Sequence, residues 1–219
     1  MKWDHASDSG GGDLRADAER NRQLLLQAAR EVFAEQGLEA SSKEIARRAG
    51  VGIATLFRRF PTRQDLLVAT FGHKLAAYTE AIDRALQDPD PWRGFCHYLT
   101  TITGMQAGDR GFRDILTQAF PAAPELRAQR DRIYRGVVEL IEKAKATGRL
   151  RADFVPEDVP LVLMANAGVV AATADHAPES SDRLVGYLLQ AFAASAADEL
   201  PPPATPRRMY RALTRHQPG

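Results

Sequence analysis

Residues 45–60, IARRAGVGIATLFRRF, decide the fold class of this chain. Their apolar residues recur at helical spacing, and Gly50 and Gly52 interrupt them once. Glycine readily adopts the left-handed conformation that follows a helix, so we expect a helix ending at Gly50. A second helix is expected over residues 53–59, stopped by Phe60-Pro61. Two short helices joined by a tight glycine turn form a helix-turn-helix.

The flanking residues extend this helical pattern in both directions. Ser41 and Glu44 form an S-x-x-E capping box before the first short helix. Upstream, a helix from Asp17 to Gly37 carries one apolar stripe: Leu25, Ala28, Ala29, Val32 and Phe33. Downstream, Thr62 is expected to cap a longer helix, with Asp65 three residues later.

Positive charge is concentrated around the helix-turn-helix. The chain as a whole has a net charge of +1, but residues 41–63 contain six basic residues and one acidic residue, Glu44. The basic residues are Lys43, Arg47, Arg48, Arg58, Arg59 and Arg63. Such a stretch is typical of an element that faces phosphates. The alternative is a helical hairpin in an all-α core with solvated arginines.

In a DNA-bound helix-turn-helix, the second helix enters the major groove and its N-terminal residues meet base edges. We therefore expect Gly52, Ile53 and Thr55 to face bases. Arg58, Arg59 and Arg63 are expected to reach phosphates or guanines.

Length and composition restrict the remaining possibilities. A chain of 219 residues, 44% hydrophobic and 26% charged, suits one large or two small globular domains. It has no apolar run of about 18 residues and no secretory signal, which predicts a cytoplasmic protein. Cys96 is the single cysteine, so no internal disulfide is possible. This thiol is either inert and buried or an oxidant sensor.

The chain is expected to be all-α, with two domains. We predict a disordered tail over residues 1–13 and a helix-turn-helix domain with a connecting fourth helix over 14–87. The DPDP turn at 88–91 marks the boundary to a helical bundle over 88–200. Residues 201–219, which begin PPPATPRR, are expected to form a disordered tail.

Residues 20–67 resemble the N-terminal DNA-binding domain of TetR-family transcriptional regulators. The motifs A-x-x-x-F-A-x-x-G, E-I-A-x-x-A-G-V and T-L-F-x-x-F-P-T-R-x-x-L carry the resemblance. It implies a homodimer that reads a near-palindromic operator, and a C-terminal domain that binds a small molecule and releases the DNA. Taken together, the helix-turn-helix pattern and the resemblance predict these DNA contacts: Ser41, Ser42, Lys43, Gly52, Ile53, Ala54, Thr55, Phe57, Arg58, Arg59 and Arg63. Two positions depart from the family pattern: Phe57 replaces a frequent tyrosine, and Ser42 replaces a frequent apolar residue.

The second half contains candidates for a ligand site on its apolar and aromatic faces. They either line a cavity, which the resemblance favours, or form a core: Trp92, Phe95, Tyr98, Leu99, Ile102, Met105, Phe112, Leu116, Phe120, Tyr134, Val137 and Asn166. Asn166 could instead bond a backbone carbonyl or a dimer mate. His97, His176 and Gln118 are weaker polar candidates. Few of these residues are charged, which predicts a lipophilic or aromatic effector.

The last two helices are rich in small residues and are expected to pair two copies of the chain. The predicted interface residues are Leu184, Tyr187, Leu188, Ala191 and Phe192. The chain contains no H-E-x-x-H motif, no phosphate-binding loop and no nucleophile–base pair, so we expect no enzyme, cofactor or metal. A DNA-binding regulator controlled by a partner protein, without a small-molecule effector, remains the alternative to a ligand-released repressor.

Overall fold

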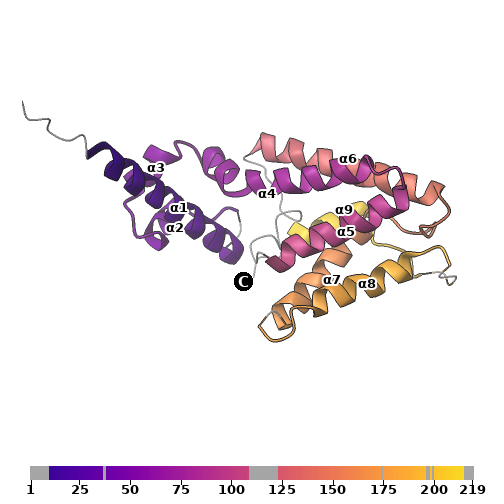
Figure 1. Ribbon diagram of the computed structural model, residues 1–219. Coiled ribbons are helices and arrows are strands. Elements are labelled where there is room, and N and C mark those ends of the chain that lie inside the picture. The colour runs from indigo at the N-terminus through magenta and orange to yellow at the C-terminus, as the bar shows by residue number, and fades with distance from the viewer. Residues whose placement is uncertain are drawn as a thin grey trace, which may run out of the picture. The chain divides into compact units, whose positions relative to one another are not determined.

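The computed structural model describes residues 10–36, 38–108, 123–173, 175–195, 198 and 200–214. This part of the chain forms α1 (Gly10–Gln36), α2 (Ser42–Arg48), α3 (Ile53–Arg59), α4 (Arg63–Leu86), α5 (Pro91–Gly108), α6 (Pro124–Ala146), α7 (Asp158–Thr173), α8 (Ser180–Phe192) and α9 (Pro206–Thr214) (Figure 1). Its only β-type pairing is an isolated bridge between Leu150 and Ala193. The all-α prediction is confirmed. The sequence GFRDILTQAF at 111–120 also predicts a short helix, and these residues lie outside the described ones.

The chain divides into two compact units, residues 1–70 and 71–219, and each is described by itself. The division falls inside α4, because the first turns of this helix belong to one core and its later turns to the other. Leu66 and Leu67 are buried in the first unit, whereas Leu75 and Ile82 are buried in the second. A helix shared in this way carries no break in composition. The boundary expected at 88–91 stays a prediction.

The first unit is built on the apolar stripe of α1. Leu25, Ala29, Val32 and Phe33 are buried, and α1 packs against α2, which packs against α3. The start of α4 is capped as predicted: the Thr62 backbone N–H donates to the Asp65 carboxylate at 2.9 Å, and the Asp65 N–H donates to the Thr62 hydroxyl at 3.1 Å. These contacts fix where α4 begins.

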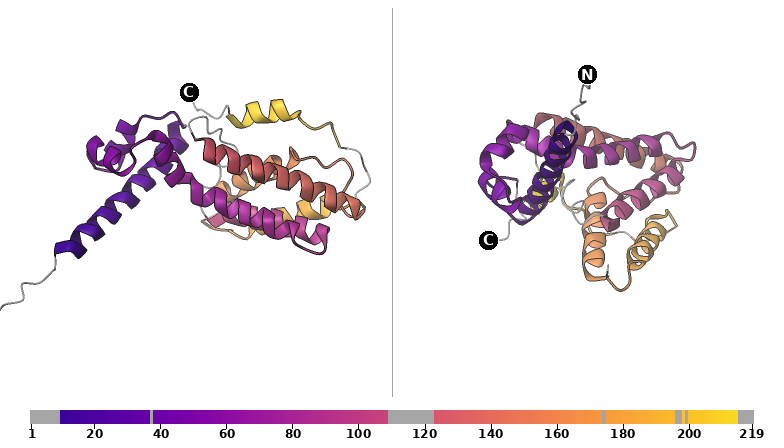
Figure 2. Two further views of the ribbon diagram at one scale, coloured as in Figure 1. Left: turned by 90° about the horizontal axis from the view of Figure 1, so that it is seen from above. Right: turned by 60° about the vertical axis from the view of Figure 1, so that its left-hand side comes forward.

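The second unit is centred on α5, which packs against α6, α7 and α8. Helices α4 and α6 run alongside each other, as do α7 and α8 (Figures 1 and 2). Gly136 lets α6 approach α4 closely, since a Cβ atom at this position would lie 2.6 Å from Cγ1 of Ile82. The α4–α6 contact therefore depends on the missing side chain.

Both ends of the described chain are more helical than expected. Helix α1 begins at Gly10, inside the predicted N-terminal tail, and α9 lies inside the predicted C-terminal tail. The Arg208 N–H donates to the Thr205 hydroxyl at 3.4 Å, and Pro206 occupies the first turn. Met209 is buried. The helix start at Thr205-Pro206 and the buried Met209 side chain thus account for a helix in a segment whose composition predicts disorder. In the described part of the chain, no helix is both long and apolar enough to cross a membrane.

Candidate nucleic-acid interface and cavity

The turn between α2 and α3 has the geometry that its sequence predicts. The Ser41 hydroxyl accepts a 3.2 Å hydrogen bond from the Glu44 N–H and caps α2. Gly50 has a φ of +68°. The Gly50 N–H donates to the Arg47 carbonyl at 3.1 Å, and the Val51 N–H donates to the Ala46 carbonyl at 3.0 Å. These paired bonds end the helix at Gly50, as predicted, and turn the chain directly into α3.

Helix α3 has one buried face and one exposed apolar face. Leu56 is buried within the unit, as is Phe60 just after the helix. On the adjoining face, Ile53 is 40% exposed and Phe57 is 47% exposed. Ala54 beside them is exposed, and Thr55 is half-buried. An apolar surface of this kind on a helix suits contact with another molecule.

Two of the basic residues near the turn are neutralised by acids. Arg47 donates to the two carboxylate oxygens of Glu44 at 2.8 and 2.6 Å, and Arg48 donates to those of Glu35 at 2.9 and 2.7 Å. The hydrogen bonds from Arg47 and Arg48 lower the pKa of Glu44 and of Glu35, respectively. Glu44 therefore uses its carboxylate for an ion pair, and Ser41 performs its half of the capping box.

Arg63 is used for packing within the first unit. Its guanidinium group donates to the Leu38 carbonyl and, at 2.9 Å, to the Ala40 carbonyl. It also lies over the Phe33 ring, 5.8 Å from the ring centroid. This side chain holds the connection between α1 and α2, so its guanidinium group is already engaged within the chain. Its DNA contact stays a prediction.

Lys43, Arg58 and Arg59 are exposed and form no hydrogen bond or ion pair within the described residues. The two arginines lie in the last turn of α3, and Lys43 lies in the first turn of α2. Of the predicted contacts, Gly52, Ile53, Ala54 and Phe57 are exposed with them, while Ser42 and Thr55 are half-buried. The helix-turn-helix thus carries three unneutralised cations and an exposed apolar helix face, which is suited to a polyanion that also presents apolar groups.

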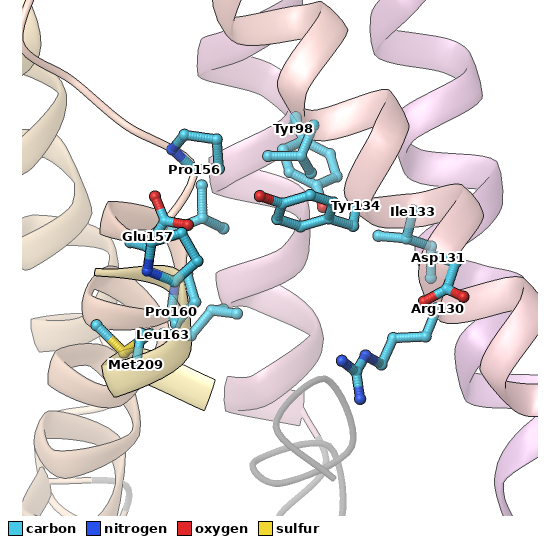
Figure 3. Close-up of a pocket in the computed structure, with 13 residues that line it drawn as sticks. Tyr98, Arg130, Asp131, Ile133, Tyr134, Pro156, Glu157, Pro160, Leu163 and Met209 are labelled. Carbon is cyan, nitrogen blue, oxygen red and sulfur yellow. The ribbon is translucent and has the colours of Figure 1, made fainter. Parts of the chain in front are cut away.

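A cavity of about 320 Å³ lies within the second unit (Figure 3). Side chains from α5, α6, α7 and α9, and from the residues just before α7, form its wall: Tyr98, Arg130, Asp131, Ile133, Tyr134, Val137, Pro156, Glu157, Val159, Pro160, Leu163, Pro206 and Met209. Of the predicted ligand residues, it contains Tyr98, Tyr134 and Val137. The residues before α7 and those of α9 were missed, although Thr205-Pro206 is a helix-start signal.

Most of the other predicted ligand residues lie in the core. Trp92 stacks on Phe95 with ring centroids 5.7 Å apart, Phe95 meets Phe154 edge-on at 5.2 Å, and Phe154 meets Phe192 at 4.9 Å. Leu99 and Ile102 are buried, and Met105 is half-buried. None of them lines the cavity. Phe112, Leu116 and Phe120 lie outside the described residues, as does Gln118.

Asn166 is a buried link between three helices. Its amide nitrogen donates to the Thr103 carbonyl at 3.2 Å and to the Gln106 side-chain oxygen at 3.3 Å, both on α5. Its amide oxygen accepts from the Ser181 hydroxyl on α8 at 2.7 Å. The network accounts for the amide of Asn166, so the structure favours the backbone-bonding alternative over a ligand contact.

The remaining polar candidates are not brought together. His97 and His176 are exposed, and the His97 ring lies 3.9 Å from the Asp88 carboxylate. Cys96 is half-buried, and burial raises the pKa of its thiol, the opposite of what a reactive cysteine needs. Within the part of the chain that the structure describes, no cluster of three or more His, Cys, Asp or Glu side chains could hold a metal.

Helices α7 and α8 present an apolar surface in the second unit. Tyr187 is 57% exposed and its hydroxyl accepts a 2.6 Å hydrogen bond from Arg183. Leu161 and Met164 of α7 are also exposed, and Leu184 and Leu188 are half-buried. Among the predicted interface residues, Ala191 is exposed, whereas Phe192 packs against Phe154 within its own chain.

The comparisons with known proteins agree on one family. Residues 25–70 match the family profile of the bacterial regulatory proteins of the tetR family, and residues 90–192 match the C-terminal domain of SbtR-like transcriptional regulators. An HTH-type transcriptional regulator of Staphylococcus aureus (strain USA300) is 41% identical over 54 residues, which are 24% of this chain and 29% of that protein. The match thus spans less than a third of the relative's own length.

Solved structures share the fold over most of the chain. The TetR family transcriptional regulator PfmR of Thermus thermophilus has a TM-score of 0.56 at 20% identity, covering 76% of this chain and 97% of that one. A TetR family regulator from Agrobacterium tumefaciens has a TM-score of 0.55 at 17% identity, covering 81% of this chain and 100% of that one. At these identities the likeness shows the fold alone.

Proposed function

The chain belongs to the TetR family of transcriptional regulators and carries the family's DNA-binding helix-turn-helix. From this premise, we propose that it is a dimeric cytoplasmic repressor that a small, largely apolar ligand releases from its operator. TetR-family regulators are DNA-binding transcription factors and not enzymes. The operator is taken to be near-palindromic, since a two-fold dimer presents two equivalent recognition helices.

One observation carries the DNA-binding part of the proposal: the helix-turn-helix has an exposed apolar face on α3 and three exposed, unneutralised cations, Lys43, Arg58 and Arg59. In the proposed complex, α3 lies in the major groove. Gly52 allows the backbone to approach the bases closely, and Ile53 and Phe57 are placed to contact thymine methyl groups. The three cations are placed to bind phosphates or guanines, with Ser41 and Ser42 near the backbone of the DNA.

The dimer is proposed to form through α7 and α8. The exposed side chains of Leu161, Met164 and Tyr187 support this assignment, together with the half-buried Leu184 and Leu188. Two-fold pairing would cover the same apolar patch on both copies. Phe192 is left out of the proposed interface because it is already packed against Phe154.

The cavity supports a small-molecule effector over control by a partner protein alone. Its volume of about 320 Å³ lies in the range of ligand pockets, and its wall is mainly apolar. A ligand that favours a conformation unsuited to the operator would weaken DNA binding, and DNA would weaken ligand binding by the same factor.

The proposal is tested by selecting bound fragments from genomic DNA with the purified chain and then titrating the best site at increasing salt. We expect a near-palindromic site, two copies of the chain on each site, and an affinity that falls steeply with salt. Arg135→Ala, which removes an exposed arginine of α6, is a control expected to bind like the wild type. No enrichment over random DNA, or a single copy bound at micromolar protein, would contradict it.

A further inference from the structure

We propose that α9 carries a second DNA-binding surface, in which Arg207 and Arg208 bind the phosphate backbone of a duplex. The inference rests on the proposed function in taking DNA as the partner of this chain. It adds a contact outside the helix-turn-helix, on a helix of the second unit. Such a contact responds to charge and not to base sequence.

The sequence contains three Arg-Arg pairs, and the structure separates them by their partners. The pair at 47–48 is neutralised, because each guanidinium group donates to both carboxylate oxygens of one glutamate. The pair at 58–59 is exposed and unneutralised, and it is the proposed DNA contact of α3. The pair at 207–208 is likewise exposed, and its guanidinium groups have no partner among the described residues. Adjacent unneutralised guanidinium groups suit phosphate oxygens, with which arginine forms paired hydrogen bonds.

Acidic residues are absent from the sequence around the third pair. Residues 201–219 contain four arginines and no Asp or Glu, although the whole chain has 29 basic and 28 acidic residues. Two exposed arginines elsewhere in the second unit are paired with acids: Arg132 donates to Asp83 at 2.7 Å, and Arg149 donates to Asp90 at 2.8 Å. The charge of the pair at 207–208 is therefore available to a partner outside the chain.

The packing of α9 turns this pair outward. At about 100° per residue, Arg207 and Arg208 lie on the side of the helix opposite Pro206 and Met209. Met209 is 7% exposed and lines the cavity, as does Pro206 (Figure 3). The apolar side thus anchors the helix, and the two guanidinium groups are held at the surface of a packed element.

The same arrangement favours DNA over a lipid surface. A helix that lies on a membrane buries its apolar face in the lipid. Pro206 and Met209 already belong to the cavity wall, so this side of α9 is occupied within the chain. The exposed arginines are sufficient for a duplex, because each cation that neutralises a phosphate releases counterions.

The test measures binding to a labelled duplex of random sequence by the full chain without its helix-turn-helix arginines. Fluorescence anisotropy gives the affinity at several salt concentrations for Arg58→Ala/Arg59→Ala, the background chain. In this background, Arg207→Gln/Arg208→Gln removes the third pair, and Arg207→Lys/Arg208→Lys keeps its charge. Circular dichroism checks the fold of every variant.

Arg84→Gln/Lys143→Gln, made in the same background, is the matched control. Both residues are exposed side chains of the second unit, and they lie 3.9 and 2.7 Å from the carboxylates of Glu80 and Glu139, respectively. The control therefore removes the same net charge from the same unit, at positions that an acid already neutralises.

We expect the Gln pair at 207–208 to lower the slope of log affinity against log salt by about 0.9 for each lost phosphate contact, or about 1.8 for each bound copy. Its loss of affinity between about 50 and 200 mM salt should then be about tenfold smaller than in the background chain. The Lys pair and the control should keep the slope of the background chain. An unchanged slope in the Gln pair, an equal fall in the control, or no binding by the background chain at low salt would overturn the inference.

Vesicles of phosphatidylglycerol are titrated in parallel. Vesicle binding that depends on the pair at 207–208, with an unchanged slope on DNA, would assign the surface to lipid and overturn the inference. The operator selection uses the intact helix-turn-helix, so a selected operator with an unchanged slope here leaves the proposed function standing. A lowered slope here without any selected operator would support this surface and contradict the proposed function.

Discussion

The guanidinium group of Arg48 in α2 donates to both carboxylate oxygens of Glu35 in α1, at 2.9 and 2.7 Å. The carboxylates of Glu31 and Glu44 lie 3.8 Å from the same group. Arg48 thus joins the helix-turn-helix to the helix beneath it, while Arg58 and Arg59 remain unneutralised. The basic residues near the turn differ in role although they look alike in the sequence.

Glu35→Gln should remove a stabilisation that depends on pH. Arg48 lowers the pKa of Glu35 in the folded chain. The carboxylate therefore stabilises the fold above its unfolded pKa of about 4.3, and this stabilisation is lost as pH falls through the lowered folded value. Urea unfolding should show the variant slightly less stable than the wild type at pH 7, with the difference shrinking steadily below pH 4. The pair is exposed, so salt should reduce the difference at pH 7.

Glu39→Gln is the matched control for this measurement, because Glu39 is an exposed acid in the same unit that forms none of these ion pairs. A Glu35→Gln effect of equal size at pH 7 and well below pH 3 would show that the ion pair is not its cause.

Arg58→Ala and Arg59→Ala should each weaken operator binding without unfolding the chain. Loss of a base contact costs about 1–3 kcal/mol and relaxes specificity at that base pair, whereas loss of a phosphate contact lowers the salt dependence by about one ion. Titration of the selected operator and of single-base variants, each at several salt concentrations, distinguishes the two. If both variants bound like the wild type, α3 would not be the recognition helix.

Arg63→Ala should lower stability and leave the DNA contacts in place. The variant leaves the Leu38 and Ala40 carbonyls without their charged donor. We therefore expect the free energy of unfolding to fall by about 1–3 kcal/mol. Arg63→Lys should recover only part of it, because an ammonium group lacks the fork that spans two carbonyls. Measured where the variants are folded, the salt dependence of operator binding should match the wild type. A dependence reduced by one ion would show that Arg63 contacts DNA.

Ser181→Ala should destabilise the second unit by about 1–3 kcal/mol, because it leaves the buried Asn166 amide oxygen unpaired. Ser180→Ala, which changes the half-buried neighbour, serves as the control. Urea unfolding of both variants gives the two free energies. An unchanged free energy of unfolding for Ser181→Ala would show that this hydrogen bond does not stabilise the unit.

The sequence predicted features that local chemistry determines. The Ser41 cap, the left-handed turn at Gly50 and the Thr62–Asp65 cap each involve residues no more than a few positions apart, and all three are present. The exposed face of α3 follows from helical periodicity. Nothing beyond the local sequence was needed for the helix-turn-helix.

Features that depend on tertiary contacts were not predictable in this way. Arg48 and Glu35 are 13 positions apart, Arg63 and Leu38 are 25 apart, and Asn166 and Thr103 are 63 apart. Composition could not tell a paired arginine from an unpaired one. It also could not separate the Trp92–Phe95 core from the cavity wall, because both are aromatic and helical. The order of α9 depends on Met209 finding an apolar surface, which only the folded chain provides.

The Asn166 network also sets the register between helices. A purely apolar contact between helices can slide by a fraction of a turn at little cost, but a shift of α7 along α5 would break two hydrogen bonds of one buried amide together. A shift of α8 would break the third. Helices α5, α7 and α8 are therefore pinned as a single body. Helices α6 and α9 contribute to the cavity wall but not to this network, so a ligand can shift their wall residues without breaking it.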